Sequence, residues 1–309
     1  MSASAASEPP GGEDGPEDGL PRVGHLGPQG TFTEEALLAG AQPGACRPVA
    51  QETIQDTILA LGRGEVEWAI APIENSLDGT VTVTLDLLVD LVDEIQIVGE
   101  ELLSVRHLLS AAEGLAFEGI QTVLTHPQVP GQCRRFLREQ LAGARVVPAS
   151  STADAVRLAA SADLAEGLAA IGTALAAEIY GAKVLADGVQ DRDDNLTRFA
   201  WLGPRSQPAA AAPLRPRATA ARKTSLVFWG AGADHSGWLV QCLDKFARRQ
   251  INLTKIESRP TRERMGHYMF FVDLEGDAQD ELVAAAIDGL RRCCEEVRVL
   301  GSYAAAASR

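Results

Sequence analysis

The sequence predicts an α/β protein with two folded parts, and three observations support this prediction. Five times before residue 203, a short apolar run ends in small polar residues and continues into a helical pattern. Residues 204–222, rich in Pro and Ala, then interrupt the apolar periodicity. The remaining chain reads strand, helix, strand, strand, helix, strand. Apolar runs that alternate with amphipathic helices are typical of a mostly parallel sheet covered by helices.

Length and composition set the class of protein. A chain of 309 residues with 46% hydrophobic residues can form two domain cores. The net charge of −14 argues against a nucleic-acid surface, and no apolar run is long enough to span a membrane. Residues 1–21 are acidic and rich in Pro and Gly, which predicts a disordered tail. They lack the basic start and apolar core of a signal peptide, so we expect a cytoplasmic protein.

The cysteines predict no special site. Their number is odd, and none of them forms a C-x-x-C pair. Neither a disulfide framework nor a zinc site is therefore indicated, and structural thiols are expected. The set is Cys46, Cys133, Cys242, Cys293 and Cys294.

In the first part, the strand-helix units span residues 22–40, 66–91, 120–141, 144–161 and 168–181. Polar residues lie where the helices should begin: Thr31-x-x-Glu34 fits a capping box, and Ser151, Thr152 and Thr173 can cap or adjoin later helices. Helix starts offer unpaired N–H groups and a partial positive charge. Several around one cleft can therefore bind an anion, although capping alone explains each single residue.

The second part predicts strands over 224–230, 251–260, 266–276 and 297–303, and helices over 238–249 and 281–294. This order is that of a ferredoxin-like βαββαβ module. In its first helix an apolar stripe recurs at i, i+3, i+4 and i+7, which indicates a core face rather than a set of ligands. The stripe consists of Leu239, Cys242, Leu243 and Phe246.

Six motifs carry a family resemblance: GPQGTFTEEA, APIENSLDGTV, THPQVPGQCRRFL, SSTADAV, AAIGTALAAEIYG and DNLTRF. In this order and spacing they resemble prephenate dehydratases, and INLTKIESRP resembles the regulatory ACT domain of that family. The resemblance runs from about Val23 to Tyr303. It implies a catalytic domain over 22–203 with two subdomains around a cleft, similar to a periplasmic binding protein. A linker over 204–222 and an ACT domain over 223–303 would follow.

The implied reaction converts prephenate to phenylpyruvate, water and carbon dioxide in L-phenylalanine biosynthesis. Losing carbon dioxide and the ring hydroxyl makes the ring aromatic, so a donor at the departing oxygen and a dry pocket suffice, without a metal or cofactor. The resemblance implies that Thr197 is this hydrogen-bond donor. It also assigns catalytic roles to Asn75, Thr125 and Gln132. Thr125 stands where many members of the family have serine.

Candidate substrate-binding residues are Gly30, Thr31, Ser76, Ser151, Thr173 and Arg198. Arg198 can pair with a substrate carboxylate, or equally form a structural ion pair with Asp191, Asp193 or Asp194. Glu74 is expected to have a structural role. We expect His126 to act by position, and His107 and Cys133 to pack in the core.

The resemblance also implies an L-phenylalanine site in the ACT domain, and homodimers or homotetramers formed through that domain. Trp238 stands where relatives have a small residue, so we expect its indole to occupy the effector space and weaken the response to phenylalanine. The candidate effector residues are Asp234, Ser236, Gly237, Trp238, Leu239, Asn252, Leu253, Glu257 and Ser258.

Two alternatives stay open. An arogenate dehydratase performs the same elimination on the amino-acid analogue, and assays of both substrates separate the two activities. A non-catalytic, two-lobed amino-acid sensor has a similar cleft, but it does not need the DNLTRF segment and usually carries an export signal. The chain shows no basic helical segment typical of a fused chorismate mutase, so a monofunctional enzyme is expected.

Overall fold

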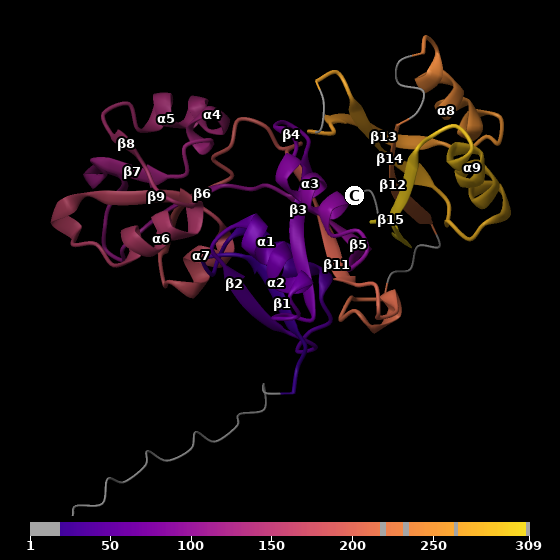
Figure 1. The fold of residues 1–309 in the computed structure, drawn as a ribbon. Coiled ribbons are helices and arrows are strands. Elements are labelled where there is room, and N and C mark those ends of the chain that lie inside the picture. The colour runs from indigo at the N-terminus through magenta and orange to yellow at the C-terminus, as the bar shows by residue number, and fades with distance from the viewer. Residues whose placement is uncertain (1–18, 217–220, 231–234, 263–264, 307–309) are drawn as a thin grey trace, which may run out of the picture.

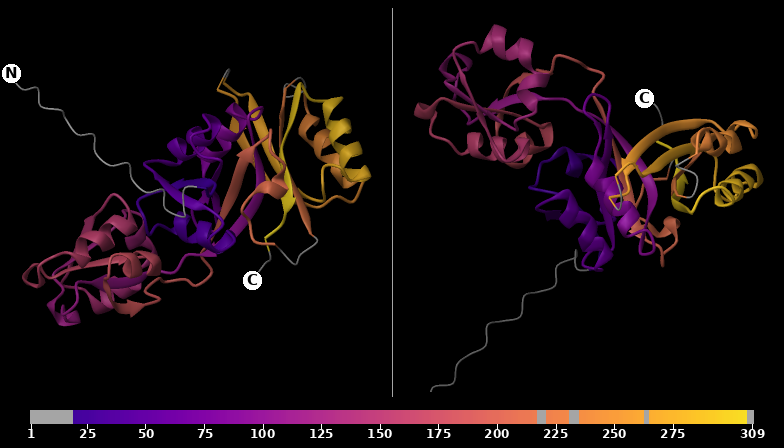
Figure 2. Two further views of the ribbon diagram at one scale, coloured as in Figure 1. Left: turned by 90° about the horizontal axis from the view of Figure 1, so that it is seen from below. Right: turned by 45° about the horizontal axis from the view of Figure 1, so that its top comes forward.

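A computed structural model describes residues 19–216, 221–230, 235–262 and 265–306. The chain forms two α/β lobes and a C-terminal module (Figure 1). Lobe I (residues 22–104 and 196–216) lies between lobe II (residues 108–187) and the module. Figure 2 shows the same arrangement from two other directions. Most of the predicted N-terminal tail, residues 1–18, lies outside the described residues.

Lobe I is built on a mixed sheet with the strand order β2-β1-β3-β11-β5, in which β4 also pairs with β3. Strands β1, β2 and β3 are parallel, whereas β11 runs antiparallel to both β3 and β5. The elements are β1 (Arg22–Leu26), α1 (Phe32–Gly40), β2 (Arg47–Gln51), α2 (Ile54–Gly62), β3 (Trp68–Asn75), β4 (Gly79–Thr80), α3 (Thr82–Asp90), β5 (Ile95–Ser104) and β11 (Leu196–Pro204).

Lobe II holds a second mixed sheet with the order β10-β6-β9-β7-β8. Strands β7, β8 and β9 are parallel, and β6 is antiparallel to β9 and β10. The elements are β6 (Leu108–Ala111), η1 (Phe117–Gly119), β7 (Thr122–Thr125), α4 (Val129–Gln132), α5 (Arg134–Gln140), β8 (Arg145–Pro148), α6 (Thr152–Ala160), η2 (Leu164–Glu166), β9 (Leu168–Gly172), α7 (Ala174–Ile179) and β10 (Lys183–Asp187).

The chain crosses between the lobes twice, after β5 and again before β11. The two crossings are bonded to each other, because Val105 N–H donates to the Asn195 carbonyl at 2.8 Å and Val189 N–H donates to the His107 carbonyl at 3.0 Å. The two-lobed α/β region is thus confirmed. The sheets are less parallel than the alternation of strands and helices indicates, since β11 returns from lobe II and enters lobe I antiparallel to its neighbours.

The C-terminal module has the predicted βαββαβ order, with the sheet order β13-β14-β12-β15. Helices α8 and α9 cover one face of the sheet, and the other face packs on lobe I (Figures 1 and 2). Phe271 and Leu300 of the module share a core with Ile97 and Leu202 of lobe I. The elements are β12 (Arg222–Trp229), α8 (Trp238–Ala247), β13 (Leu253–Pro260), β14 (Tyr268–Glu275), α9 (Glu281–Arg291) and β15 (Glu296–Ala304).

The described part of the predicted linker lies on lobe I. It contains the short helix η3 (Ala209–Ala211), and Leu214 forms an isolated bridge with Ala41. Arg215 Nε donates to the Ala41 carbonyl at 2.6 Å. Residues 204–216 therefore extend the surface of lobe I rather than span open solvent. Along the described chain, no helix combines the length and the apolar character needed to cross a membrane.

Candidate active site

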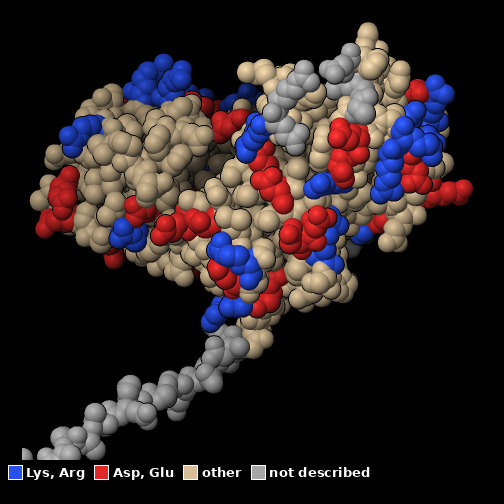
Figure 3. All heavy atoms as spheres, in the orientation of Figure 1, with Lys and Arg blue, Asp and Glu red and all other residues tan. Residues whose placement is uncertain are grey.

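A cleft of about 680 Å³ separates the two lobes, and both lobes line it. Figure 3 shows the surface hollowed at this position. Five helices begin at the cleft, because their first residues line it: Phe32 of α1, Ile54 of α2, Thr82 of α3, Val129 of α4 and Thr152 of α6. The lining holds no Lys or Arg among the described residues. The positive potential available to an anion therefore comes mainly from helix N-termini.

Two predicted binding residues both cap a helix and line this cleft. Thr31 Oγ1 accepts a hydrogen bond from Glu34 N–H at 3.3 Å, and Ser151 Oγ accepts one from Asp154 N–H at 3.0 Å. The capping box at Thr31 is only half formed, since the Glu34 carboxylate accepts from Gly30 N–H instead of Thr31 N–H. Capping and site formation are thus not exclusive at these positions.

Thr197 and Asn75 face each other across neighbouring strands. They are register partners on β11 and β3, and both line the cleft. Asn75 Nδ2 donates to Thr197 Oγ1 at 2.9 Å and to Asn195 Oδ1 at 2.8 Å, while Asn75 Oδ1 accepts from the backbone N–H groups of Leu77 and Asp78. Because an amide nitrogen only donates, the Thr197 oxygen is the acceptor. Its own hydrogen is left for a partner in the cleft.

A chain of amides and an imidazole joins this pair to lobe II. Gln132 Oε1 accepts from His107 Nε2 at 2.9 Å and from Asn195 Nδ2 at 3.4 Å. Gln132 thus lies in the cleft as predicted, but Asn195 and His107 were not predicted as site residues. Asn195 precedes Thr197 by two positions, and residues two apart share one face of a strand. That spacing in DNLTRF could have identified it.

His107 lines the cleft instead of only packing in the core, so the prediction of a core role was incomplete. Burial lowers the pKa of the His107 imidazole, and the hydrogen bond with Gln132 opposes this only in part. The unfolded chain therefore takes up a proton more readily than the folded chain. The free energy of unfolding is therefore unaffected by His107 above the unfolded pKa of about 6.5. It decreases as the pH falls below that value, because the unfolded chain then takes up the proton first.

We therefore expect His107→Gln to reduce the loss of stability on acidification, because it removes this proton uptake on unfolding. The free energy of unfolding in urea, measured at about pH 8 and about pH 5.5, gives the pH dependence. The exposed His235 offers a matched control, His235→Gln. An equal pH dependence in the wild type and His107→Gln would contradict the assignment of a neutral, buried imidazole.

Four other predicted residues, Gly30, Ser76, Thr125 and Thr173, lie beside the cleft but do not line it. Thr125 is fully buried and donates to the Ile171 carbonyl at 2.8 Å. Thr173 Oγ1 donates to the Gly30 carbonyl at 2.5 Å, which ties α7 to the turn before α1. Ser76 Oγ accepts from Leu196 N–H at 2.9 Å and holds the start of β11. These side chains position the walls of the cleft, so direct substrate contacts are not expected of them.

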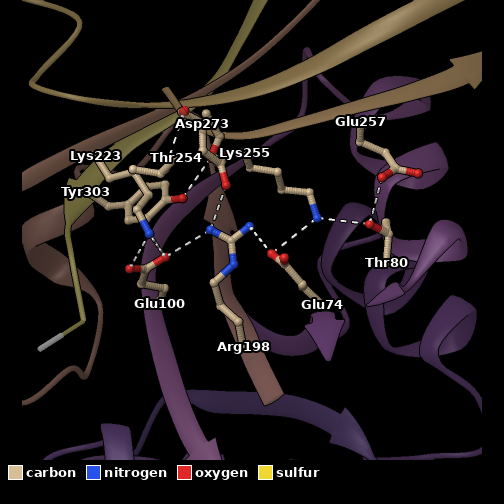
Figure 4. A network of polar contacts seen from close by, with 11 residues as sticks. Glu74, Thr80, Glu100, Arg198, Lys223, Thr254, Lys255, Glu257, Asp273 and Tyr303 are labelled. Carbon is tan, nitrogen blue, oxygen red and sulfur yellow. Dashed lines mark hydrogen bonds and ion pairs between the residues drawn. The ribbon is translucent and has the colours of Figure 1, made fainter. Parts of the chain in front are cut away.

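The position of Arg198 corrects the expectation that it binds the substrate. It lies in a buried ionic network at the boundary between lobe I and the C-terminal module (Figure 4). Its guanidinium nitrogens lie 2.7 Å from Asp273 Oδ2, 3.3 Å from Glu100 Oε2 and 3.3 Å from Glu74 Oε2. Burial alone lowers the pKa of Arg198, but Asp273, Tyr303, Glu100 and Glu74 raise it above its usual value. Arg198 therefore forms a structural ion pair, as one of the two expectations had it, but with Asp273, Glu100 and Glu74 instead of Asp191, Asp193 or Asp194, and it does not line the cleft.

The same network gives Glu74 its predicted structural role. Lys255 Nζ lies 3.2 Å from Glu74 Oε2 and donates to Thr80 Oγ1 at 3.0 Å, and Thr80 in turn donates to Glu257 Oε2 at 3.1 Å. Thr80 also lines the cleft. Strand β13 of the module therefore reaches the rim of the candidate site through side-chain contacts.

A second, smaller pocket of about 240 Å³ lies at the start of α8. It brings together three predicted effector residues, Gly237, Trp238 and Leu239, with Tyr268 and Phe270. The indole forms part of the wall of this pocket, and the expectation that it occupies the effector space stays a prediction. Its N–H donates to the Cys293 carbonyl at 2.7 Å, which directs the ring inward.

The other predicted effector residues lie elsewhere in the described chain or outside it. Glu257 faces lobe I, Ser236, Asn252 and Ser258 are exposed outside the pocket, and Leu253 packs in the core of the module. Asp234 lies outside the described residues. Among the described residues, the pocket at α8 therefore contains three of the predicted effector residues, all of them at the start of that helix.

The fold and the cleft define a two-lobed α/β protein with an appended module of the ACT class, and comparisons with known proteins place it among the lyases. A family model described as prephenate dehydratase matches residues 23–207, and an ACT domain model matches residues 233–292. The chain belongs to the prephenate dehydratase family. The predicted domain limits themselves stay predictions.

Individual relatives cover nearly the whole chain. A prephenate dehydratase of Mycolicibacterium gilvum is 38% identical over 296 residues, which cover 92% of this chain and 91% of the relative. The crystal structure of an Arthrobacter aurescens prephenate dehydratase in complex with L-Phe matches with a TM-score of 0.79 at 38% identity, over 92% and 89% of the two chains. A quorum quenching acylase also matches, with a TM-score of 0.79 at 28% identity over 92% and 98%.

Proposed function

We propose that the cleft converts prephenate to phenylpyruvate, with Thr197 as the hydrogen-bond donor to the departing hydroxyl. The observation that carries this proposal is the Asn75–Thr197 hydrogen bond of 2.9 Å at the wall of the cleft. It occupies the threonine oxygen as an acceptor and leaves its hydrogen for the substrate. Such a donor suits a leaving group that departs as hydroxide and takes up a proton to become water.

The electrons for this departure come from the substrate. As the bond between the ring and its carboxylate breaks, the electron pair moves into the ring, the carbon–oxygen bond breaks, and carbon dioxide and water leave an aromatic ring. One proton is taken up overall. The protein then has to bind a dianion and hold the leaving oxygen next to Thr197, and these are positioning and electrostatic tasks.

Helix N-termini are the proposed carboxylate sites. Thr31, Ser151 and the first residues of α1 and α6 line the cleft, and they come from different lobes. A substrate that contacts both helix starts would hold the lobes together and exclude water from the ring. Glu52 and Asp78 also line the cleft, so its negative charge disfavours anions that cannot reach the helix N-termini.

Turnover of prephenate by the purified chain tests this function directly. We expect formation of phenylpyruvate, and a parallel assay with arogenate, read as phenylalanine formation, separates the two dehydratase activities. Turnover of arogenate alone would assign the other dehydratase. Binding of either compound without turnover would favour the amino-acid sensor.

Acylase chemistry finds less support in the cleft, despite the matching acylase structure. An acylase needs a nucleophile in hydrogen-bond contact with a base. Among the described residues, the hydroxyl of Thr197 contacts an amide, and His107 contacts the amide of Gln132. Neither contact joins a nucleophile to a base. The Ser150 hydroxyl, which also lines the cleft, donates to Asp154, but that carboxylate is already paired with Arg157.

We further propose that L-phenylalanine binds the pocket at α8, completed by a second copy of the chain. The related Arthrobacter aurescens enzyme was solved with L-Phe. Here, the pocket walls include Trp238, Tyr268 and Phe270, which suit an aromatic ring. Strand β13 is an edge of its sheet with Ile256 49% exposed, and Val240 beside the pocket is 70% exposed. Such an edge supports association through the module as a homodimer or homotetramer.

Trp238→Phe is expected to weaken L-phenylalanine binding by up to about 12-fold, since an aromatic contact contributes about 0.5–1.5 kcal/mol and the smaller ring of phenylalanine keeps only part of it. Isothermal titration calorimetry measures this change. Trp229→Phe is the matched control, because Trp229 lies under Arg298 and packs in the core shared with lobe I. Tighter binding by Trp238→Phe would mean that the indole competes with the ligand for the pocket.

A further inference from the structure

Three cysteine side chains converge in the C-terminal module, although they are distant in sequence. Cys242 is buried in α8, and Cys293 and Cys294 are half-buried just after α9. The Cys242 sulfur lies 3.6 Å from the Cys294 sulfur and 4.0 Å from the Cys293 sulfur. All three sulfurs lie within 4.8 Å of one another. In the described chain, no other group of three or more His, Cys, Asp or Glu residues has its ligand atoms this close together.

These separations are close to those of a metal-thiolate site. With metal–sulfur bonds of about 2.3 Å, sulfurs are about 3.8 Å apart around a tetrahedral ion and about 4.0 Å apart around a trigonal one. The two pairs that include Cys242 already match these separations. The pair Cys293–Cys294 lies on the turn after α9, so small side-chain rotations can close it around an ion. A disulfide, by contrast, needs a sulfur separation of about 2.05 Å.

The surroundings hold the three thiols in place. The Cys293 carbonyl accepts the Trp238 indole N–H at 2.7 Å, and the Cys293 thiol donates to the Gly289 carbonyl at 3.4 Å. Cys242 belongs to the core between α8 and the sheet. The partial exposure of Cys293 and Cys294 leaves a path for an ion from solvent.

We propose that Cys242, Cys293 and Cys294 form a binding site for one soft d10 metal ion. Thiolates select such ions, Cu⁺ and Zn²⁺ among them, over Mg²⁺ or Ca²⁺. Three thiolates suffice for a trigonal Cu⁺ ion, whereas Zn²⁺ would take a water molecule as its fourth ligand. The thiols lose their protons to solvent as the ion binds.

The test uses the reduced, full-length chain, titrated separately with Zn²⁺ and Cu⁺ and with Mg²⁺ as the hard-ion control. Native mass spectrometry gives the number of ions per chain, and Co²⁺ serves as a probe whose charge-transfer absorption reports thiolate ligands. We expect one soft ion per chain, with both signals lost in Cys294→Ser. The matched control is Cys46→Ser, because Cys46 is also half-buried but lies in lobe I.

Cys242→Ser gives a second variant, and the melting temperature gives a second measurement. Metal that binds the folded site raises the melting temperature of the wild type and of Cys46→Ser, but should leave Cys294→Ser and Cys242→Ser unchanged. The proposal is overturned if neither Zn²⁺ nor Cu⁺ binds the reduced chain. One equivalent of metal retained by Cys294→Ser would overturn it as well.

Discussion

Thr197→Ala is expected to lower kcat for prephenate by about 10²- to 10⁴-fold, the range that a positioned proton donor contributes. The hydroxyl is the group that Asn75 orients, and no acceptor within the described chain takes its hydrogen. Steady-state kinetics of phenylpyruvate formation measure the effect. The substitution also removes a hydrogen-bond partner from Asn75, but Asn195 still accepts from the same amide at 2.8 Å.

Two further variants separate donation from packing. Thr197→Ser retains the hydroxyl and removes the methyl group, so it should keep substantial activity. Thr197→Val retains the shape and removes the hydroxyl, so it should be as slow as alanine. Urea unfolding of each variant shows whether the fold is intact. An active valine variant, or a serine variant as slow as alanine, would show that packing of the methyl group matters more than its neighbouring hydroxyl.

Asn75→Ala extends this test to the orienting residue. It removes both the donor to Thr197 and the acceptor for the backbone N–H groups of Leu77 and Asp78. Both kcat and the order of the turn after β3 should therefore change, whereas Thr197→Val should leave that turn intact.

The secondary structure of the C-terminal module could be predicted from sequence because each element has a clear local pattern. The helix predicted over 238–249 is α8 at Trp238–Ala247, and the strand predicted over 297–303 is β15 at Glu296–Ala304. The contacts between parts could not be predicted in this way. The docking of β15 beside β5, and of residues 204–216 on lobe I, joins segments that are far apart in sequence.

The roles of Thr197 and Arg198 show what a motif leaves undetermined. The two residues are adjacent in DNLTRF. The resemblance assigned Thr197 to the substrate, and for Arg198 a substrate carboxylate and a structural ion pair were both considered. On strand β11, however, neighbouring side chains point to opposite faces. Thr197 pairs with Asn75 at the cleft, and Arg198 pairs with Glu74 on the other face. Recognising the segment as a strand would have predicted that only one of the two faces the substrate.

The thiol cluster was missed for a related reason. Metal sites are recognised in sequence by short spacings between ligands, and Cys242 is 51 residues from Cys293. The helical stripe correctly placed Cys242 in the core, together with Phe246. What the stripe could not show is that the end of α9 brings Cys293 and Cys294 against the same side chain.

Arg198→Met is expected to destabilise the chain by about 3–5 kcal/mol, because it removes a buried cation and leaves buried carboxylates without it. Glu100 is 3% exposed and Asp273 is 5% exposed, and both lie next to the guanidinium (Figure 4). Lys223 still neutralises Glu100 at 2.8 Å, so the penalty falls mainly on Asp273. The free energy of unfolding measures this loss.

An exposed arginine provides the control. Arg106 pairs with Asp187 at 2.8 Å, but both side chains are more than half exposed, so Arg106→Met should change stability little. Arg198→Lys keeps the charge while losing the forked geometry, so it should fall between the wild type and methionine. If Arg198→Met lowered the free energy of unfolding no more than Arg106→Met does, the network would contribute nothing to stability.

Kinetics of the same variants decide between the two roles considered for Arg198. Replacing a side chain that binds a substrate carboxylate raises KM and leaves the fold intact. Replacing a side chain that holds the module against lobe I lowers the stability of the fold and leaves KM nearly unchanged in the molecules that remain folded. We expect the second pattern for Arg198→Lys. Arg198 follows Thr197 on β11 and contacts Asp273 of β14. If L-phenylalanine is the effector, as proposed, loosening this contact should also change its effect on kcat. A large rise in KM at wild-type stability would return Arg198 to the substrate.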